Sequence, residues 1–78
     1  MSSELSDCVT DAFNTCFPDA ELLQDSDFFD LGGDSLKAVE LCLLIGRRLG
    51  TEVHPSILFS HSTPVTLTDA LRHEYGSL

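Results

Sequence analysis

The sequence predicts an all-α fold, a small bundle of about four helices with a long first loop and a very short third helix. Apolar residues recur at helical spacing in an early, a middle and a late segment. Prolines and glycines lie where these segments begin or end. With 78 residues, the chain has room for one modest core and no deep substrate cavity. We therefore expect a single domain over residues 1–78, with a folded core of about residues 5–75.

The first helix is expected to begin at a cap formed by Ser2 or Ser3 and to end near Cys16, because Pro18 follows. One helical face collects the apolar residues Leu5, Cys8, Val9, Ala12, Phe13 and Cys16. The three cysteines, Cys8, Cys16 and Cys42, are odd in number and form no Cys-x-x-Cys pair. They predict small core residues in a reducing setting, without a disulfide framework or a zinc site.

Residues 18–33 form a connection longer than an ordinary helix–helix loop. Its apolar residues imply that it packs against the bundle; they are Leu22, Leu23, Phe28, Phe29 and Leu31. We expect Phe28 and Phe29 to be core residues that fix the loop. One turn of helix around residues 19–23 is compatible with the sequence.

The second helix is expected from Ser35 to Leu49, with Gly50 just past its end and Arg47 and Arg48 near its negative pole. It carries two apolar stripes. One suits the core and consists of Ala38, Leu41, Cys42, Ile45 and Leu49. The other, which we call the apolar ridge, consists of Leu36, Val39 and Leu43. Because both stripes cannot face one small core, we expect the ridge to be partly exposed and to serve as a docking site.

The late part of the chain predicts a short turn and a last helix. Pro55 opens the turn, in which Ile57, Leu58 and Phe59 are expected to pack. Thr63 is the expected N-cap and Pro64 the first residue of the last helix. Its expected core-facing residues are Val65, Leu67, Ala70 and Leu71, and we expect fraying near Gly76.

Ser35 lies where the second helix begins. Gly32 and Gly33 before it permit unusual backbone dihedrals and remove side-chain bulk beside the serine. Asp34 is a candidate N-cap, which would leave the Ser35 hydroxyl facing solvent in the first turn. A phosphate on that oxygen would lie at the positive end of the helix dipole, so the place suits the covalent attachment of an anionic group.

The stretch Phe28-Phe29-Asp30-Leu31-Gly32-Gly33-Asp34-Ser35-Leu36 resembles the phosphopantetheine attachment motif of carrier protein domains. Within the acyl carrier protein superfamily, it is most similar to the peptidyl carrier, or thiolation, domains of nonribosomal peptide synthetases, and the resemblance covers roughly residues 5–75. It implies a bundle of the acyl-carrier-protein type. Carrier domains commonly have a Phe-x-x-Pro-Thr stretch before the last helix. Here the stretch is Phe59-Ser60-His61-Ser62-Thr63-Pro64, with the proline two places later.

The resemblance also implies the chemistry. A phosphopantetheinyl transferase would move 4′-phosphopantetheine from coenzyme A onto Ser35, with Gly33 and Asp34 completing the attachment site. The thiol of the arm would then hold acyl, aminoacyl or peptidyl groups as thioesters for nonribosomal peptide or polyketide type biosynthesis. The carrier itself would be non-catalytic, because the transferase supplies the magnesium and the base.

Further implied partners are domains of the adenylation, condensation, ketosynthase, reductase or thioesterase type. They would dock on the apolar ridge, with Lys37 as a candidate contact for the phosphate or an acidic partner. The cargo, and whether the chain is free-standing or part of a larger synthetase, stay open.

The charge distribution indicates which classes of partner to expect. The formal net charge is −9, and all nine acidic residues up to position 36 lie in a part of the chain without Lys or Arg. Nucleic acid and anionic membranes are therefore poor partners, and a basic protein surface is a better one. The sequence contains no basic n-region followed by an apolar h-region and no apolar run near membrane-spanning length, so we expect neither a signal peptide nor a membrane span. We expect a cytoplasmic monomer.

Other function classes fit less well. A calcium loop of the EF-hand kind starting at Asp25 would need glycine at its sixth place and glutamate at its twelfth, where the chain has Asp30 and Leu36. A serine hydrolase would need a Gly-x-Ser-x-Gly elbow, and this pattern does not surround Ser35. The histidines His54, His61 and His73 suggest no metal site. The remaining alternative is an unmodified helical interaction module that docks through the apolar ridge.

Overall fold

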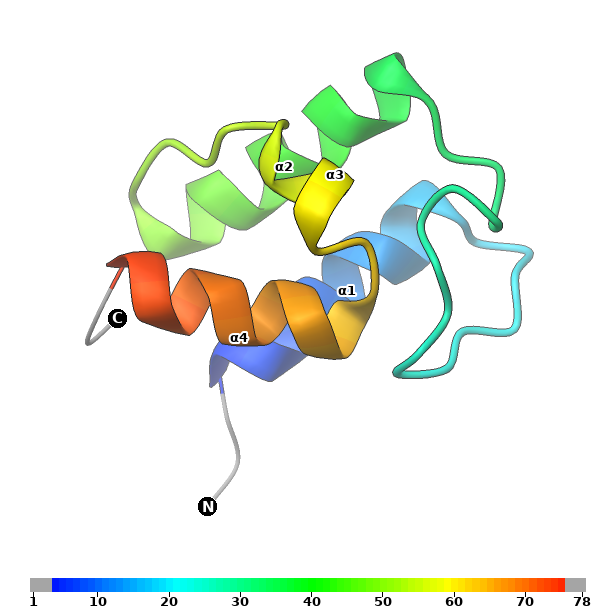
Figure 1. Ribbon diagram of the computed structural model, residues 1–78, viewed down its shortest axis with the longest axis horizontal. Coiled ribbons are helices and arrows are strands. Elements are labelled where there is room, and N and C mark those ends of the chain that lie inside the picture. The colour runs from blue at the N-terminus through cyan, green and yellow to red at the C-terminus, as the bar shows by residue number, and fades with distance from the viewer. Residues whose placement is uncertain (1–3, 76–78) are drawn as a thin grey trace.

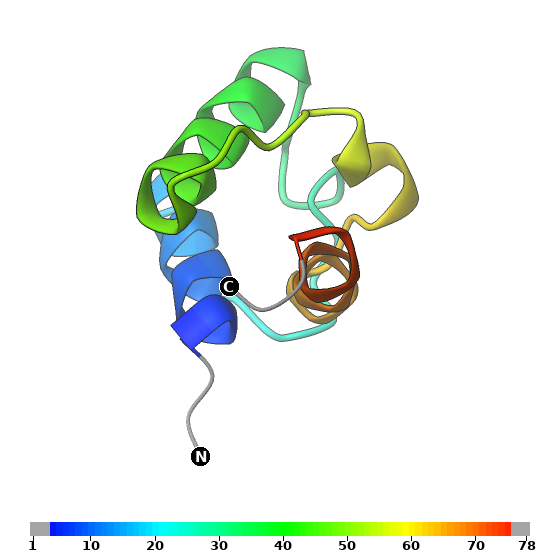
Figure 2. The same ribbon diagram turned by 90° about the vertical axis from the view of Figure 1, so that its left-hand side faces the viewer.

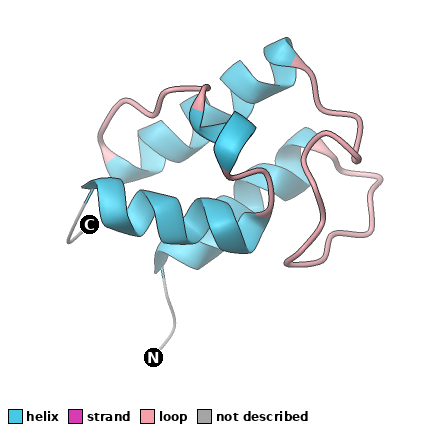
Figure 3. Cartoon of the chain, in the orientation of Figure 1, coloured by secondary structure: helices cyan, strands magenta, loops and turns pink. Residues whose placement is uncertain are grey.

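The structure, a computed structural model, describes residues 4–75. Within that range it contains four helices and no strand (Figure 3). The helices are α1 (Glu4–Cys16), α2 (Ser35–Leu49), α3 (Ile57–Ser60) and α4 (Pro64–Tyr75). The predicted all-α bundle with a long first loop and a very short third helix is therefore confirmed.

Helix α1 is the common packing partner of the two other long helices. It packs against α2 and against α4, while α3 packs against α4 (Figures 1 and 2). The core between them is built from the predicted helix faces and from loop residues. Its fully buried large side chains are Val9, Phe13, Phe28, Leu41, Ile45, Leu58, Pro64, Leu67 and Leu71. Cys8, Cys16 and Cys42 are buried free thiols, as predicted.

The helix ends follow local capping chemistry. The Asp34 carboxylate accepts a hydrogen bond of 2.9 Å from the Lys37 amide at the start of α2. Gly50 ends α2 in the left-handed conformation, with φ of 73°. At α4 the Thr63 hydroxyl accepts from the Thr66 amide at 3.1 Å, with Pro64 as the first helical residue. These three ends confirm the predictions, whereas the expected cap at Ser2 or Ser3 and the fraying near Gly76 lie outside the described residues.

The long loop differs from the prediction in its first half. No helical turn forms over residues 19–23; the chain bends after Phe17, whose carbonyl accepts from the Ala20 amide at 3.1 Å. It then runs across the end of the bundle to α4, where the Gln24 carbonyl accepts from the Val65 amide at 3.1 Å (Figure 1). This crossing requires a more extended path than a helix allows. Leu22 is partly buried, but Leu23 is exposed, contrary to the expectation that it packs inward.

Three other apolar residues expected in the core are wholly or partly exposed: Phe29, Phe59 and Val65. In α4 the buried stripe runs through Pro64, Leu67, Thr68 and Leu71, which turns Val65 outward. The buried Thr68 hydroxyl is satisfied within the helix, because it donates to the Pro64 carbonyl at 2.7 Å. The prediction was therefore wrong for Val65, whereas the other expected core residues of α4, Leu67, Ala70 and Leu71, are buried.

Candidate functional site

Ser35 is the first residue of α2 and is exposed. Asp34 precedes it in an extended conformation, and its side-chain hydrogen bond to the first turn turns that carboxylate toward the Lys37 amide. The free amide hydrogens of a helix start point along the axis, and the helix dipole adds positive potential there. A phosphate on the Ser35 oxygen would therefore be electrostatically favoured at this position.

The two glycines before the serine serve different purposes. Gly32 has φ of +102°, a conformation that L side chains rarely adopt. Gly33 has no positive φ, but a Cβ at this residue would lie only 2.3 Å from the nearest ring atom of Phe28. Gly32 is thus required by the backbone and Gly33 by close packing.

Phe28 anchors the loop that leads to Ser35. Its ring is fully buried and packs edge-on against Phe13 and Phe17, with centroid distances of 6.3 and 5.5 Å. The Gly33 amide donates to the Phe28 carbonyl at 3.0 Å, so the residue is fixed through its backbone as well. The predicted role of Phe28 as a core residue that fixes the loop is confirmed.

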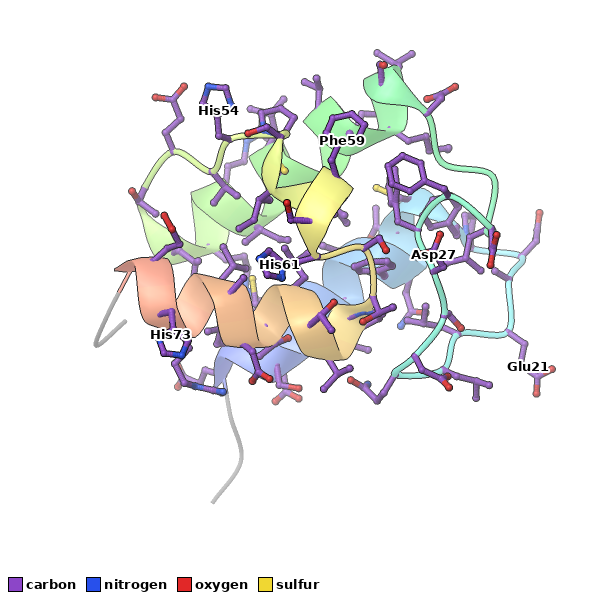
Figure 4. All side chains as sticks on the ribbon, viewed as in Figure 1. Glu21, Asp27, His54, Phe59, His61 and His73 are labelled. Carbon is purple, nitrogen blue, oxygen red and sulfur yellow. The ribbon has the colours of Figure 1, made fainter. Side chains whose placement is uncertain are left out.

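Asp27, labelled in Figure 4, lies on the same loop, and its carboxylate accepts three hydrogen bonds. One carboxylate oxygen accepts from the amides of Phe29 and Asp30, at 3.0 and 3.1 Å. The other oxygen accepts from the hydroxyl of Ser62, the residue two before α4. The Ser62 hydrogen bond is the main cause that lowers the pKa of Asp27 below its ordinary value. Sequence reasoning gave Asp27 no role here; an aspartate at the start of a loop turn is a signal for such local capping.

The apolar ridge is exposed as predicted. Leu36 is 70 % exposed, Val39 43 % and Leu43 55 %, and all three follow Ser35 along α2. An open groove of about 620 Å³ between α2 and the segment after it continues the ridge. Val39, Leu43, Val53 and Pro55 are among its lining residues. Lys37, in contrast, lies with its ammonium 5.6 Å from the centroid of the Phe17 ring, over the end of α1.

A pair of aromatic side chains outside α2 is also exposed. Phe29 is 39 % exposed and Phe59 is 69 % exposed. Their rings are stacked, with a centroid distance of 5.6 Å and an interplanar angle of 23°. The pair joins the loop to α3, where Figure 4 labels Phe59. Sequence reasoning missed this pair because it placed both residues in the core.

The histidines and the thiols are the other candidate reactive side chains. Figure 4 shows His54 and His73 at the opposite end of the molecule from Asp27. Among residues 4–75, no group of three His, Cys, Asp or Glu side chains is placed to hold a metal ion. Burial raises the pKa of all three thiols, to about 11 for Cys42. Over the described range, the helices are too short or too polar to cross a membrane.

Comparisons with known proteins agree with this geometry. A family model described as "Phosphopantetheine attachment site" matches residues 3–71. The chain is 48 % identical over 50 residues to the probable nonribosomal peptide synthetase CymA of Salinispora arenicola, covering 64 % of this chain. It is 44 % identical over 52 residues to the beauvericin nonribosomal cyclodepsipeptide synthetase of Beauveria bassiana, covering 67 %. It is 32 % identical over 74 residues to the cyclosporin synthetase simA of Tolypocladium inflatum, covering 95 %.

The chain spans 2 % or less of the length of each of these relatives. Among solved structures, BlmI, a type-II acyl-carrier-protein from Streptomyces verticillus involved in bleomycin biosynthesis, superposes with a TM-score of 0.82. That superposition covers 91 % of this chain and 86 % of BlmI at 18 % sequence identity. The similarity to BlmI therefore establishes the fold.

Proposed function

The chain belongs to the phosphopantetheine attachment family and is a carrier protein domain, and on that premise we propose that the Ser35 hydroxyl is the attachment point. The observation that supports this proposal is the exposed position of Ser35 at the positive end of α2. The glycine pair keeps the approach to it free of side-chain bulk. Coenzyme A would be the donor of the 4′-phosphopantetheine.

The transfer requires an activated serine oxygen. That oxygen would form a bond to the phosphorus next to the pantetheine. The bond from this phosphorus to the oxygen that bridges the two phosphates would break, and adenosine 3′,5′-bisphosphate would leave. The hydroxyl proton must then go to a base. Ser35 has no side-chain hydrogen-bond partner among the described residues, so we assign the base and the magnesium to a phosphopantetheinyl transferase. In this proposal the carrier presents the Ser35 hydroxyl to the transferase and contributes no catalytic group.

The loaded arm would hold acyl, aminoacyl or peptidyl groups as thioesters. The relatives are nonribosomal peptide synthetases of which this chain corresponds to a very small part. We therefore assign catalysis to other domains, of the adenylation, condensation, ketosynthase, reductase or thioesterase type, which the arm would visit in turn. A tether of this kind raises the effective concentration of the cargo at each domain without requiring tight binding.

Docking of these partners would use the exposed apolar surface around the arm. The ridge of Leu36, Val39 and Leu43 begins one residue after Ser35, and the stacked Phe29 and Phe59 add a second exposed apolar group on the loop and α3. Exposed aromatic and aliphatic side chains of this kind are typical interface anchors. The net charge of −9 favours partner surfaces that are basic at their rims.

Intact-protein mass spectrometry tests the proposal. The protein is incubated with coenzyme A, magnesium and a promiscuous phosphopantetheinyl transferase, next to Ser35→Ala and to Ser60→Ala, an exposed serine on α3. We expect a gain of one phosphopantetheine in the wild type and in Ser60→Ala, and none in Ser35→Ala. No gain in a folded wild type shown to be unmodified at the start would refute the proposal and favour an unmodified interaction module that uses the ridge.

A further inference from the structure

The second half of the loop that leads to Ser35 is tied to the segment before α4 by two hydrogen bonds. The Ser62 hydroxyl donates to the Asp27 carboxylate, and the Phe28 amide donates to the Ser62 carbonyl at 2.7 Å. We call the side-chain contact the Asp27–Ser62 clamp. The two residues lie 35 positions apart in the sequence, so the clamp forms only when the bundle is folded.

The clamp acts on the half of the loop that presents the serine. The Asp27 carboxylate also accepts hydrogen bonds from the amides of Phe29 and Asp30. The ring of Phe28 lies against Gly33. Asp34 and Ser35 follow directly. The position of the Ser35 hydroxyl therefore depends on a short chain of contacts that starts at the clamp.

The first half of the loop has its own ties. The Gln24 carbonyl accepts from the Val65 amide at 3.1 Å, and the Gln24 amide group lies 3.5 Å from the Thr10 hydroxyl. Both contacts hold the chain before Asp27, so they do not replace the clamp. A hydrogen bond to an ionised carboxylate is about twice as strong as a neutral one, and the lowered pKa of Asp27 agrees with such a bond.

The Ser62 hydrogen bond constrains two segments at once, the residues before α4 and the loop that leads to Ser35.

We propose that Asp27 and Ser62 are positioning residues for the modification of Ser35, holding residues 27–34 in the conformation that the transferase recognises. The inference rests on the proposed function. A loop that samples other conformations presents the serine for only part of the time, and apparent affinity falls by that fraction. Loss of the clamp should therefore raise the KM for the carrier and leave kcat unchanged.

The test is steady-state transfer from a fluorescent coenzyme A analogue at a temperature where all variants are folded by circular dichroism. Asp27→Ala and Ser62→Ala remove the clamp. Asp30→Ala removes a charge from the same turn, and Ser60→Ala removes an exposed hydroxyl nearby; both are matched controls. Ser62→Thr keeps the hydroxyl and is the rescue variant. We expect KM for the carrier to rise about threefold to tenfold in the first two variants only, with faster amide exchange in residues 28–34.

The outcomes separate the inference from the proposed function. A modified wild type with unchanged KM in Asp27→Ala and Ser62→Ala overturns the inference and leaves the proposed function standing. Equal KM values in Ser62→Thr and Ser62→Ala, or a fall of kcat instead of a rise of KM, also overturn it. A wild type that is not modified at all refutes the proposed function, and the inference falls with it.

Discussion

Replacing Gly33 by alanine places a methyl group where the ring of Phe28 already lies. A Cβ at residue 33 would come within 2.3 to 2.6 Å of three ring atoms, whereas carbon atoms in contact prefer about 3.5–4.0 Å. The ring cannot turn away freely, because it is fully buried and packs edge-on against Phe13 and Phe17. The substitution must therefore shift either the core or the segment that presents Ser35.

Overpacking of a well-packed core typically costs about 1–3 kcal/mol. We expect Gly33→Ala to lower the free energy of unfolding by about 2 kcal/mol, the middle of that range. In a domain of 60–100 residues, 1 kcal/mol corresponds to about 4–8 °C in Tm. The expected fall in Tm is therefore roughly 8–16 °C for this chain, measurable by circular dichroism at the helical signal.

A double-mutant cycle with Phe28→Leu tests the cause. The smaller side chain opens space where the new methyl group would lie, so the double variant should lose less stability than the sum of the two single variants. A coupling of about 1 kcal/mol is typical of residues in contact. Gly32→Ala is the matched control, because its strain lies in the backbone with φ of +102° and a Cβ there would meet nothing within 4 Å.

Strict additivity between Gly33→Ala and Phe28→Leu would contradict the assigned packing role of Gly33. The same is true if Phe28→Leu relieves Gly32→Ala to an equal extent, since the relief would then not come from the ring. A Gly33→Ala protein as stable as the wild type would show that the ring can move, and the assigned role of Phe28 as a rigid anchor of the serine loop would be wrong.

Three further predictions concern the ridge, the thiols and the clamp. Leu43→Asp should change the free energy of unfolding by no more than about 0.5 kcal/mol, as for other surface substitutions, and should weaken cargo transfer at partner domains. The control, Leu41→Asp, lies at a fully buried position of the same helix and should unfold the protein. If the two variants were destabilised equally, the ridge would not be exposed. The three native thiols should react with Ellman's reagent at neutral pH much more slowly than the thiol of an attached arm, because burial raises their pKa, to about 11 for Cys42. If one thiol of the unmodified protein reacted as fast as the thiol of the arm, this prediction would be contradicted. The folded-state pKa of Asp27 lies below the unfolded one, so its stabilising contribution is present above about pH 4 and is lost as the pH falls through the folded pKa. The difference in unfolding free energy between the wild type and Asp27→Ala should therefore shrink on acidification. A difference that stays constant with pH would contradict the assigned hydrogen bonds of Asp27.

The helices were predictable because their boundaries depend on local chemistry. Asp34 and Gly50 fix the two ends of α2 through a cap and a left-handed residue, and both effects need only neighbouring backbone groups. Thr63 and Pro64 do the same for α4. The apolar ridge was also predictable, since a helix with two apolar stripes in a small bundle must expose one of them.

The loop and its contacts were less predictable because they depend on residues far apart in the sequence. Phe28 and Phe29 are adjacent and chemically equal, and no periodicity in a loop indicates which one points inward. Phe29 instead stacks on Phe59. The contact between Asp27 and Ser62 likewise joins the first loop to the start of the last helix. Sequence reasoning can identify each residue as a capping or apolar type, but it cannot pair them.

Site-localised mass spectrometry after transferase treatment is the most direct test of the central claim. The first basic residue is Lys37, so trypsin yields a peptide of residues 1–37 that contains five serines: Ser2, Ser3, Ser6, Ser26 and Ser35. Fragmentation of this peptide assigns the added group to one of them. The proposal predicts one phosphopantetheine on Ser35 and unmodified serine at the other four positions. A phosphopantetheine on any other serine, or a peptide that gains none, would contradict it.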